Sequence, residues 1–331
     1  MATGPPQSKS DSPPTPLRIV FMGTPALAAH ILTRLADSSR AHPEAFQIAG
    51  VVTRPDRPRG RGLAMAPSEV AAVAERNSLP ILKPAKIRTP EFLADLRALA
   101  PDLLLIAAYG RILPDAVLEA APLMPLNVHA SLLPRHRGAA PIEGAILAGD
   151  AETGVTIMRV TSRMDSGPIL LRRAIPILPD DTQGTLKEKL AELGASAALD
   201  ALEMIRRGTV VETPQDESLA TYSAPVTRED SIINWDADAA WIERMTRAYD
   251  PWPIARTKLA GGELLIWRAE ADSSHTSAEA SGTILTVAPE VAIRCGRGRL
   301  TLLEVQAPGR RRMRAADFVR GRRIAPGARL G

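Results

Sequence analysis

The stretch RIVFMGTPALAAHILTRL, residues 18–35, decides the fold class. Its apolar run Ile19–Met22 is typical of a strand buried on both faces of a parallel sheet, and Gly23 follows the run. Thr24 and Pro25 are typical of the cap and the first turn of a helix. The next apolar residues on one helical face are Leu27, Ile31 and Leu35. The pattern predicts a strand, a tight turn and a helix.

The same alternation continues outward along the chain. Further apolar runs cover residues 48–52, 103–107 and 126–128, and helix-like segments start at residues 67, 89 and 114. Strands that alternate with helices predict an α/β fold with a mostly parallel sheet, in which ligands lie at the carboxyl ends of the strands. One glycine follows the first strand where a dinucleotide site needs the spacing G-x-G-x-x-G, which disfavours a nicotinamide cofactor.

The second half of the chain has a different pattern. Residues 155–160 and 169–177 are expected to form two strands, 185–205 a long amphipathic helix, and Asp236 to cap a later helix. Beyond Pro251, five short apolar runs with glycine-rich turns indicate a small barrel or a sandwich. A length of 331 residues favours about two domains. We expect a disordered tail over 1–17, a catalytic domain over 18–208, a linker over 209–228 and a smaller domain over 229–331.

The composition excludes several classes of protein. Hydrophobic residues make up 45% and charged residues 24%, as in soluble globular chains, and no apolar run approaches the roughly 18 residues that span a bilayer. Cys295 is the one cysteine, so neither an internal disulfide nor a cysteine-based zinc site can form, and a reducing cytoplasm is expected. The amino-terminal residues show neither a secretory nor an organellar address.

The net charge of +4 hides an uneven distribution. The last 41 residues hold eleven arginines and two acidic residues, a net charge of +9, and Arg54–Gly62 holds four arginines and one aspartate. Such clusters favour a polyanionic partner, most often nucleic acid. A solvated arginine-rich surface would give the same pattern.

Two polar side chains stand at the end of the last apolar run of the α/β part. Alternation places Asn127 and His129 on one side of this strand, at the sheet edge where a ligand binds. Both are costly there unless they are hydrogen-bonded or used, so a structural pair is the alternative. Asp165, in the turn D-S-G, could steer the basicity of a nearby histidine or move a proton, or it could cap its own turn.

The motifs around these residues resemble those of the folate-dependent formyltransferase family. They are NVHASLLP at 127–134, RGAAPI at 137–142 and DSG at 165–167. Four further stretches resemble the branch of this family that formylates methionine on initiator tRNA. These are RPDRPRGRG at 54–62, GVTIM at 154–158, YDPWP at 249–253 and PGARL at 326–330. The resemblance covers about residues 18–331.

This resemblance implies a Rossmann-like amino-terminal domain that binds 10-formyltetrahydrofolate, and a small OB-like β-barrel domain that binds tRNA. The implied reaction transfers the formyl group to the α-amino group of methionine on initiator tRNA, for translation initiation. Asn127 and His129 would stabilise the oxyanion, and Asp165 would orient His129 and accept or relay the proton of the amine. No metal is implied, and we expect a monomer with no membrane partner.

The resemblance also implies which residues contact the folate and the tRNA. The folate site would be lined by Ser131, Leu132, Leu133, Pro134, Ala107, Tyr109, Gly110 and Ile112. The tRNA would be bound by Arg57, Arg59, Arg61, Arg310, Arg311 and Arg312. Leu63 and Ala64 stand where the family's basic loop often continues with lysines, which lowers the charge of this loop.

Two other functions stay open. The same chemistry could serve a small amine, such as a nucleotide sugar or glycinamide ribonucleotide, but a small acceptor needs neither arginine cluster. A non-catalytic RNA-binding protein on an inactive formyltransferase fold would not need Asn127, His129 and Asp165, all of which are present.

Overall fold

The computed structural model describes residues 15–59, 64–259 and 262–331, and its contacts divide the chain into two units. The first unit extends to Asn127 and also holds Ala198–Val211. The second unit holds Val128–Ala197 and Glu212–Gly331. The division therefore passes through a strand, through a long helix and, between Val211 and Glu212, through residues 209–228, where the sequence predicts a linker.

The first unit contains a parallel sheet. Its strands are β1 (Leu17–Gly23), β2 (Phe46–Val52), β5 (Ile81–Leu82), β6 (Leu103–Ala107) and β7 (Met124–His129), whose last two residues belong to the second unit. The strand order is β7-β6-β1-β2-β5, and every pair is parallel. β6 is buried along its whole length, as expected for a strand covered on both faces. The predicted α/β class is confirmed, but β1 begins at Leu17, which the sequence had placed in the tail.

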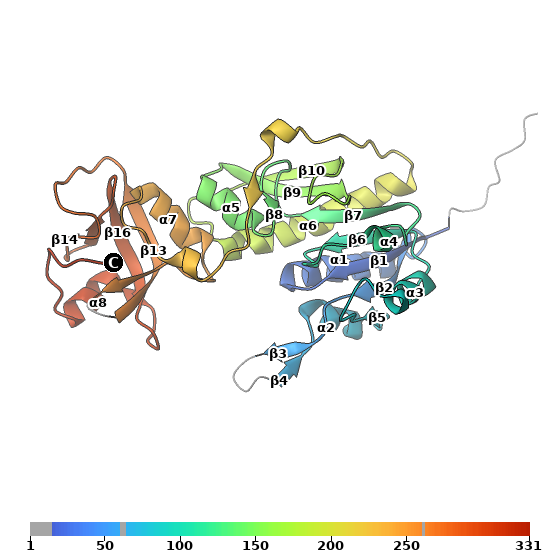
Figure 1. Ribbon diagram of the computed structural model, residues 1–331, viewed down its shortest axis with the longest axis horizontal. Coiled ribbons are helices and arrows are strands. Elements are labelled where there is room, and N and C mark those ends of the chain that lie inside the picture. The colour runs from blue at the N-terminus through green and yellow to red at the C-terminus, as the bar shows by residue number, and fades with distance from the viewer. Residues whose placement is uncertain (1–14, 60–63, 260–261) are drawn as a thin grey trace, which may run out of the picture. The chain divides into compact units, whose positions relative to one another are not determined.

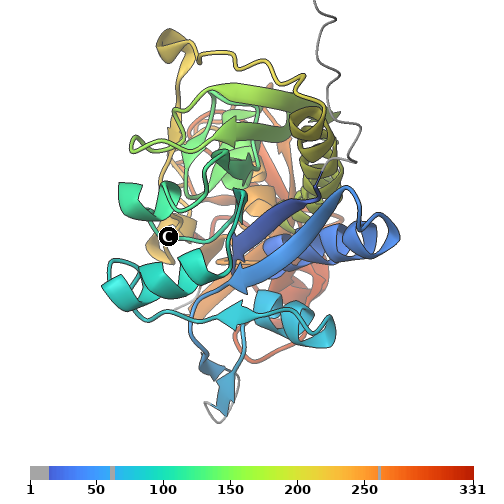
Figure 2. The same cartoon turned by 90° about the vertical axis from the view of Figure 1, so that its right-hand side faces the viewer.

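Helices cover both faces of this sheet, with α1 (Ala26–Ala41) on one side and α3 (Pro90–Ala98) on the other (Figure 2). The other helices are α2 (Glu69–Arg76) and the short α4 (Asp115–Leu118). Ser68 and Thr89 cap α2 and α3 with their side-chain oxygens, which confirms the helix starts predicted near residues 67 and 89. Thr24 does not cap α1: Pro25 occupies the cap position, and the Thr24 hydroxyl donates to the Tyr109 carbonyl at 3.3 Å.

The turn between β1 and α1 explains its glycine. A Cβ on Gly23 would lie 2.7 Å from the Ala28 side chain and 2.9 Å from the Ala107 carbonyl, closer than real Cβ atoms approach. This packing brings the ends of β1 and β6 together, since Gly23 pairs with Ala107. Ile106 pairs in turn with Asn127, so Asn127 lies at the same carboxyl edge of the sheet as the loop that follows β6.

The basic segment after β2 forms a hairpin that the sequence did not predict. Its strands are β3 (Arg57–Arg59) and β4 (Ala64–Ala66), paired antiparallel with Arg57 opposite Ala66. The hairpin extends away from the parallel strands (Figure 1).

The second unit begins with short elements around the end of β7. They are β8 (Arg137–Gly138), α5 (Pro141–Ala148), β9 (Glu152–Arg159) and β10 (Ile169–Pro176), followed by α6 (Gln183–Arg206), whose carboxyl end belongs to the first unit. β9 and β10 form an antiparallel hairpin, and with α6 they confirm the predicted strands and helix.

The expected linker is only partly irregular. It holds one 3-10 turn, at Glu217–Leu219, and β11 (Tyr222–Ser223), which pairs parallel with β8, and a second 3-10 turn follows it at Glu229–Ser231. Thr213 also exchanges two main-chain hydrogen bonds with Ile169. Residues 212–223 therefore pack as part of the second unit.

The end of the chain forms one helix-covered antiparallel sheet. Its elements are α7 (Ala239–Ala248), β12 (Arg256–Leu259), β13 (Gly262–Asp272), β14 (Ile284–Thr286), β15 (Val291–Arg294), β16 (Arg299–Gln306), β17 (Met313–Arg314) and α8 (Ala315–Gly321). The order is β12-β13-β16-β15-β14, and β17 pairs with β16. The sheet curls around buried apolar side chains, among them Leu259, Ile284 and Val305, so the small barrel expected here takes the form of a curled half-barrel. Asp238, and not Asp236, caps α7.

Across residues 15–59, 64–259 and 262–331, no helix combines the length and the apolar character needed to cross a membrane.

Candidate active site

His129 ends β7 and is buried, with 6% of its side chain exposed. Its Nε2 lies 2.9 Å from the carbonyl oxygen of His136. Because a carbonyl oxygen only accepts hydrogen bonds, we assign the hydrogen to Nε2. Its Nδ1 faces Asp165 Oδ2 at 3.7 Å. Nδ1 is therefore the ring atom that can gain or release a proton beside a carboxylate.

Asp165 lies in the turn between β9 and β10 and is held in an uncommon conformation. Its φ of 49° falls in the left-handed region, which costs free energy for a residue with a side chain. Its Oδ2, the atom that faces His129, accepts a hydrogen bond from the Gly138 main-chain N–H at 2.8 Å. The backbone conformation and this hydrogen bond together aim the carboxylate at the imidazole.

Asn127 precedes His129 by two residues in β7 and is half-buried. The two residues between and before them, Val128 and Leu126, are buried on the opposite side of the strand. Asn127 therefore presents its amide at the carboxyl edge of the parallel sheet. Its role beside His129 stays a prediction.

The S-L-L-P element, which is expected to contact the folate, is largely packed into the core. Leu133 is fully buried and packs with Met158 and Ile169. Thr156 Oγ1 donates to the Ser131 carbonyl at 2.7 Å and accepts from Leu133 N–H at 3.1 Å. This double hydrogen bond fixes the loop.

Within the same element, Ser131 and Pro134 are buried, and Leu132 is half-buried. Leu132 is therefore the side chain of the four with the most surface for a ligand. Folate contact by this element stays a prediction.

The loop after β6 carries an unusual pair of side chains. Tyr109 is 2% exposed, and its hydroxyl has no hydrogen-bond partner. Burial raises the pKa of this hydroxyl. Three residues later, Ile112 is 74% exposed. Gly110, between them, has a φ of 74°, and its carbonyl accepts a hydrogen bond from Arg54.

The arginines expected to bind tRNA differ in what the structure describes. Arg57 is exposed on β3; Arg59 belongs to the same strand, but its side chain lies outside the described residues, as does all of Arg61. Arg310 and Arg311 are exposed after β16. Arg312 is also exposed, but its guanidinium stacks over the Trp267 ring at 3.1 Å. Arg310 and Arg311 are thus more accessible to a ligand than Arg312 is.

Two further arginines add positive charge near the basic hairpin. Burial, followed by the charges of Arg57 and Arg111, lowers the pKa of Arg54. This means that three guanidinium groups gather in the first unit. Arg54 belongs to the basic cluster that the sequence shows, whereas Arg111 lies 57 residues later and joins the cluster only in the folded chain.

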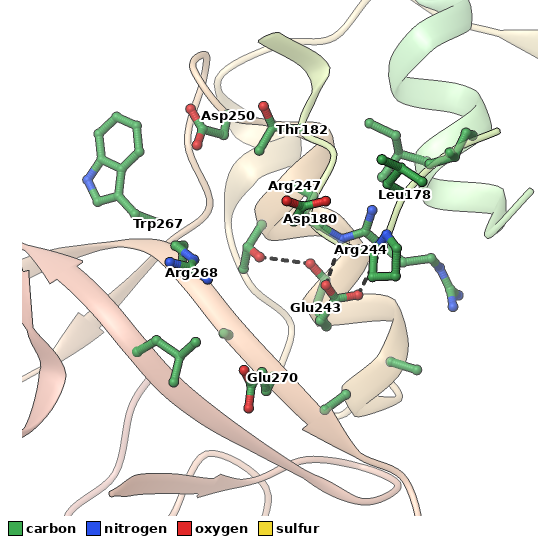
Figure 3. A pocket seen from close by; sticks show the side chains of 18 of the residues that line it. Leu178, Asp180, Thr182, Glu243, Arg244, Arg247, Asp250, Trp267, Arg268 and Glu270 are labelled. Carbon is green, nitrogen blue, oxygen red and sulfur yellow. Dashed lines mark hydrogen bonds and ion pairs between the residues drawn. The ribbon is translucent and has the colours of Figure 1, made fainter. Parts of the chain in front are cut away.

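A cavity of about 1000 Å³ lies elsewhere in the second unit, between α7, β13 and residues 177–182 (Figure 3). Within it, Arg247 Nε donates to Glu243 Oε1 at 2.7 Å, and Arg247 Nη1 donates to the Asp181 carbonyl. Neither His129 nor Asp165 lines it, so the cavity is separate from the candidate chemistry. Among the described residues, no group of histidine, cysteine and acidic side chains is arranged to hold a metal ion.

Comparison with known proteins gives a family for both halves of the chain. A model of the formyl transferase family matches residues 17–202, and a model of the formyl transferase C-terminal domain matches residues 225–323. The chain is 46% identical to the methionyl-tRNA formyltransferase of Roseiflexus sp. over 96% of both chains. It is 44% identical to the methionyl-tRNA formyltransferase of Methylococcus capsulatus, over 95% of this chain and all of that one.

Solved structures share the fold at low sequence identity. An N-formyltransferase from Helicobacter canadensis, in complex with folinic acid and dTDP-3-aminofucose, matches 88% of this chain and 99% of its own with a TM-score of 0.62 and 14% identity. HypX from Aquifex aeolicus, in complex with tetrahydrofolic acid, matches 92% of this chain and 47% of its own with a TM-score of 0.57 and 18% identity. The chain therefore belongs to the formyl transferase family and carries both of the family's domains.

Proposed function

We propose that this chain transfers the formyl group of 10-formyltetrahydrofolate to the α-amino group of methionine esterified to initiator tRNA. The observation that carries this proposal is the pair formed by the buried His129 at the end of β7 and the half-buried Asp165, with Nδ1 and Oδ2 3.7 Å apart. The identity of 46% to a methionyl-tRNA formyltransferase over nearly the whole chain supports the choice of acceptor.

The reaction needs two services from the protein. When the amine attacks the formyl carbon, negative charge builds on the formyl oxygen, and a donor aimed at that oxygen contributes typically about 3 kcal/mol to catalysis. The Asn127 amide, and His129 when Nδ1 carries a proton, are the donors that we assign to this role. The amine must also lose a proton, and Asp165 beside His129 is the group that can accept or relay it.

The co-substrate supplies the one-carbon unit, so the chain's own work is positioning and electrostatics. The loop after β6 suits a flat ring with hydrogen-bonding groups: Ile112 offers exposed apolar surface, and the buried Tyr109 hydroxyl lacks a partner. This loop stands at the carboxyl edge of the parallel sheet, where ligands of α/β folds bind. We therefore assign the pterin to Ala107, Tyr109, Gly110 and Ile112.

The acceptor is inferred from charge as well as from relatives. Exposed Arg57, Arg310 and Arg311 suit phosphates of a nucleic acid and have no evident use with a small amine. The single cysteine, Cys295, is buried and has its pKa raised to about 12 by burial, which suits a chain that does not use sulfur chemistry. We further propose a cytoplasmic monomer.

The direct test offers the purified protein 10-formyltetrahydrofolate with methionyl initiator tRNA, and in parallel with free methionine. We expect formylation of the aminoacylated tRNA and none of the free amino acid. Equal rates with both acceptors would overturn the tRNA assignment in favour of a small amine. His129→Ala should abolish transfer while tRNA binding, measured by filter retention, is preserved.

A further inference from the structure

Residues 212–223 cross two loops that carry the candidate active site. Thr213 pairs with Ile169, the first residue of β10, with N–H to O distances of 2.8 and 2.9 Å. At the other end of the segment, the Thr221 carbonyl accepts from Arg137 N–H at 2.8 Å. The segment is therefore attached on both sides, once to the hairpin that carries Asp165 and once to the R-G-A-A-P loop.

The Arg137 side chain holds this segment through hydrogen bonds to two of its residues. Its side chain is fully buried, and its guanidinium makes two hydrogen bonds to the Glu217 carboxylate, at 2.9 and 3.0 Å. It also donates to Gln215 Oε1 from Nη2 at 2.8 Å and from Nε at 3.1 Å. A planar guanidinium held at both edges has one orientation, so the partners that it binds are fixed relative to the backbone of β8.

Gln215 uses its other amide atom on the catalytic turn. Its Nε2 donates to the carbonyl of Asp165 at 2.9 Å and to the carbonyl of Gly167 at 2.8 Å. Since Oε1 already accepts from Arg137, only one orientation of the amide satisfies all of these groups. No acidic side chain of the same size could replace it, because a carboxylate would face two carbonyl oxygens without a hydrogen to donate.

Asp165 is thus held at two points by one network. Gln215 binds its main-chain carbonyl, and the N–H of Gly138, which directly follows Arg137, binds its carboxylate. The left-handed φ of 49° requires such restraint, because an unrestrained aspartate would relax to a more populated conformation.

We propose that Gln215, fixed by Arg137, is a positioning residue that holds the Asp165 turn in the conformation that aims the carboxylate at His129. This inference rests on the proposed function, since it assumes that Asp165 takes part in formyl transfer. Gln215 itself acts only through the backbone of the turn.

The test is Gln215→Glu, which keeps size and shape but removes both donated hydrogen bonds. Misplacing a catalytic group by about 1 Å can lower turnover about 100-fold, and we expect a loss of kcat of that order. The KM values for methionyl-tRNA and for 10-formyltetrahydrofolate should stay within about twofold of wild type, because Gln215 is assigned to neither substrate.

Gln183→Glu is the matched control. Gln183 Nε2 also donates to an oxygen, Glu143 Oε1 at 3.1 Å. Gln183→Glu therefore also replaces an N–H donor by a carboxylate oxygen that faces an acceptor, but it does so at the start of α6. We expect wild-type kcat from it even where its melting temperature falls as much as that of Gln215→Glu.

The outcomes separate the two proposals. Wild-type protein that does not formylate methionyl-tRNA would overturn the proposed function. Active wild-type protein with unchanged kcat in Gln215→Glu would overturn only the positioning role, as would an equal loss of kcat in Gln183→Glu.

Discussion

The loops around His129 and the two arginine clusters differ in how far their polar side chains are buried and hydrogen-bonded. Beside Asp165, His129 is 6% exposed with its Nε2 2.9 Å from a carbonyl oxygen, and Arg137 is fully buried with its guanidinium bonded to Glu217. In the arginine clusters, Arg57, Arg310 and Arg311 are exposed. Proton transfer requires atoms fixed to a fraction of an ångström, whereas phosphate binding adds up many weak, exchangeable contacts. Single substitutions should therefore be severe in the first region and mild in the second.

After the loss of transfer in His129→Ala, the largest effect is expected for Asp165→Asn. Asparagine keeps an oxygen that can accept from the Gly138 N–H, so the turn is preserved, but it has no carboxylate to accept a proton or to face His129 Nδ1. We expect kcat to fall about 1000-fold, as for the loss of a general acid or base. Single-turnover formylation measures this fall. A loss of less than tenfold would show that Asp165 does not carry the proton.

The next largest effect is expected for Arg137→Met, which keeps the bulk of a fully buried side chain but removes its charge. The variant leaves Gln215 Oε1 without its donor, and an unsatisfied polar group of this kind costs about 2 kcal/mol of the free energy of unfolding. Urea denaturation measures the loss. Glu217 is half-exposed, so Glu217→Gln should cost much less. Equal costs for the two variants would contradict a network built around the arginine.

Asp181 is a buried carboxylate of the second unit that we assign to stability and not to catalysis. Its carboxylate is 3% exposed and accepts from Leu178 N–H at 2.9 Å, from Thr185 Oγ1 at 2.8 Å and from Lys189 Nζ at 2.7 Å. Burial alone would raise the pKa of Asp181, but the hydrogen bonds, above all that from Lys189, outweigh it and hold the pKa below its ordinary value. Asp181→Asn should lower the free energy of unfolding by about 2 kcal/mol at pH 7 and leave kcat unchanged.

The pH dependence of this effect has a definite sign. Because the pKa of Asp181 is lower in the folded state, its stabilisation is fully present above the unfolded-state pKa of about 3.9 and is lost as the pH falls through the folded-state value. The deficit of Asp181→Asn should therefore shrink below about pH 4. Unfolding curves from pH 7 to pH 3 measure it, and a deficit that grows on acidification would contradict the assignment.

The sequence predicted most of the elements because their signals are local. The apolar run at Ile19–Met22 and the caps Ser68 and Thr89 need only neighbouring residues to specify a strand or a helix start. Polar residues without a periodic pattern carry less information about where a helix or strand begins. Asp236 and Asp238 are equally good caps in sequence, and in the structure it is Asp238 that accepts a hydrogen bond from the first turn of α7.

The candidate site shows the same limit. His129 and Asp165 stand out because each follows or interrupts an apolar run, so the sequence alone singled them out. Gln215 does not, because its partners lie 48 to 78 residues away and its own segment has no periodicity. For this reason the sequence predicts a linker over 209–228, although a side-chain amide within this segment binds the Asp165 turn.

The smallest effect is expected for Arg311→Ala, which removes one exposed cation. If Arg311 binds one phosphate, its loss should weaken tRNA binding about fivefold near 0.15 M salt and reduce the slope of log Kd against log salt by about one. Filter binding at several salt concentrations measures both quantities. Arg297→Ala is the matched control, because Arg297 is also exposed but is already paired with Asp238 at 2.8 Å. A similar change of slope in both variants would mean that tRNA senses the total charge of the region. A change confined to Arg311→Ala would mean that arginines without an acidic partner make the phosphate contacts. Each such arginine would then add its own increment to the binding free energy, whereas the hydrogen bonds around the buried Arg137 depend on one another.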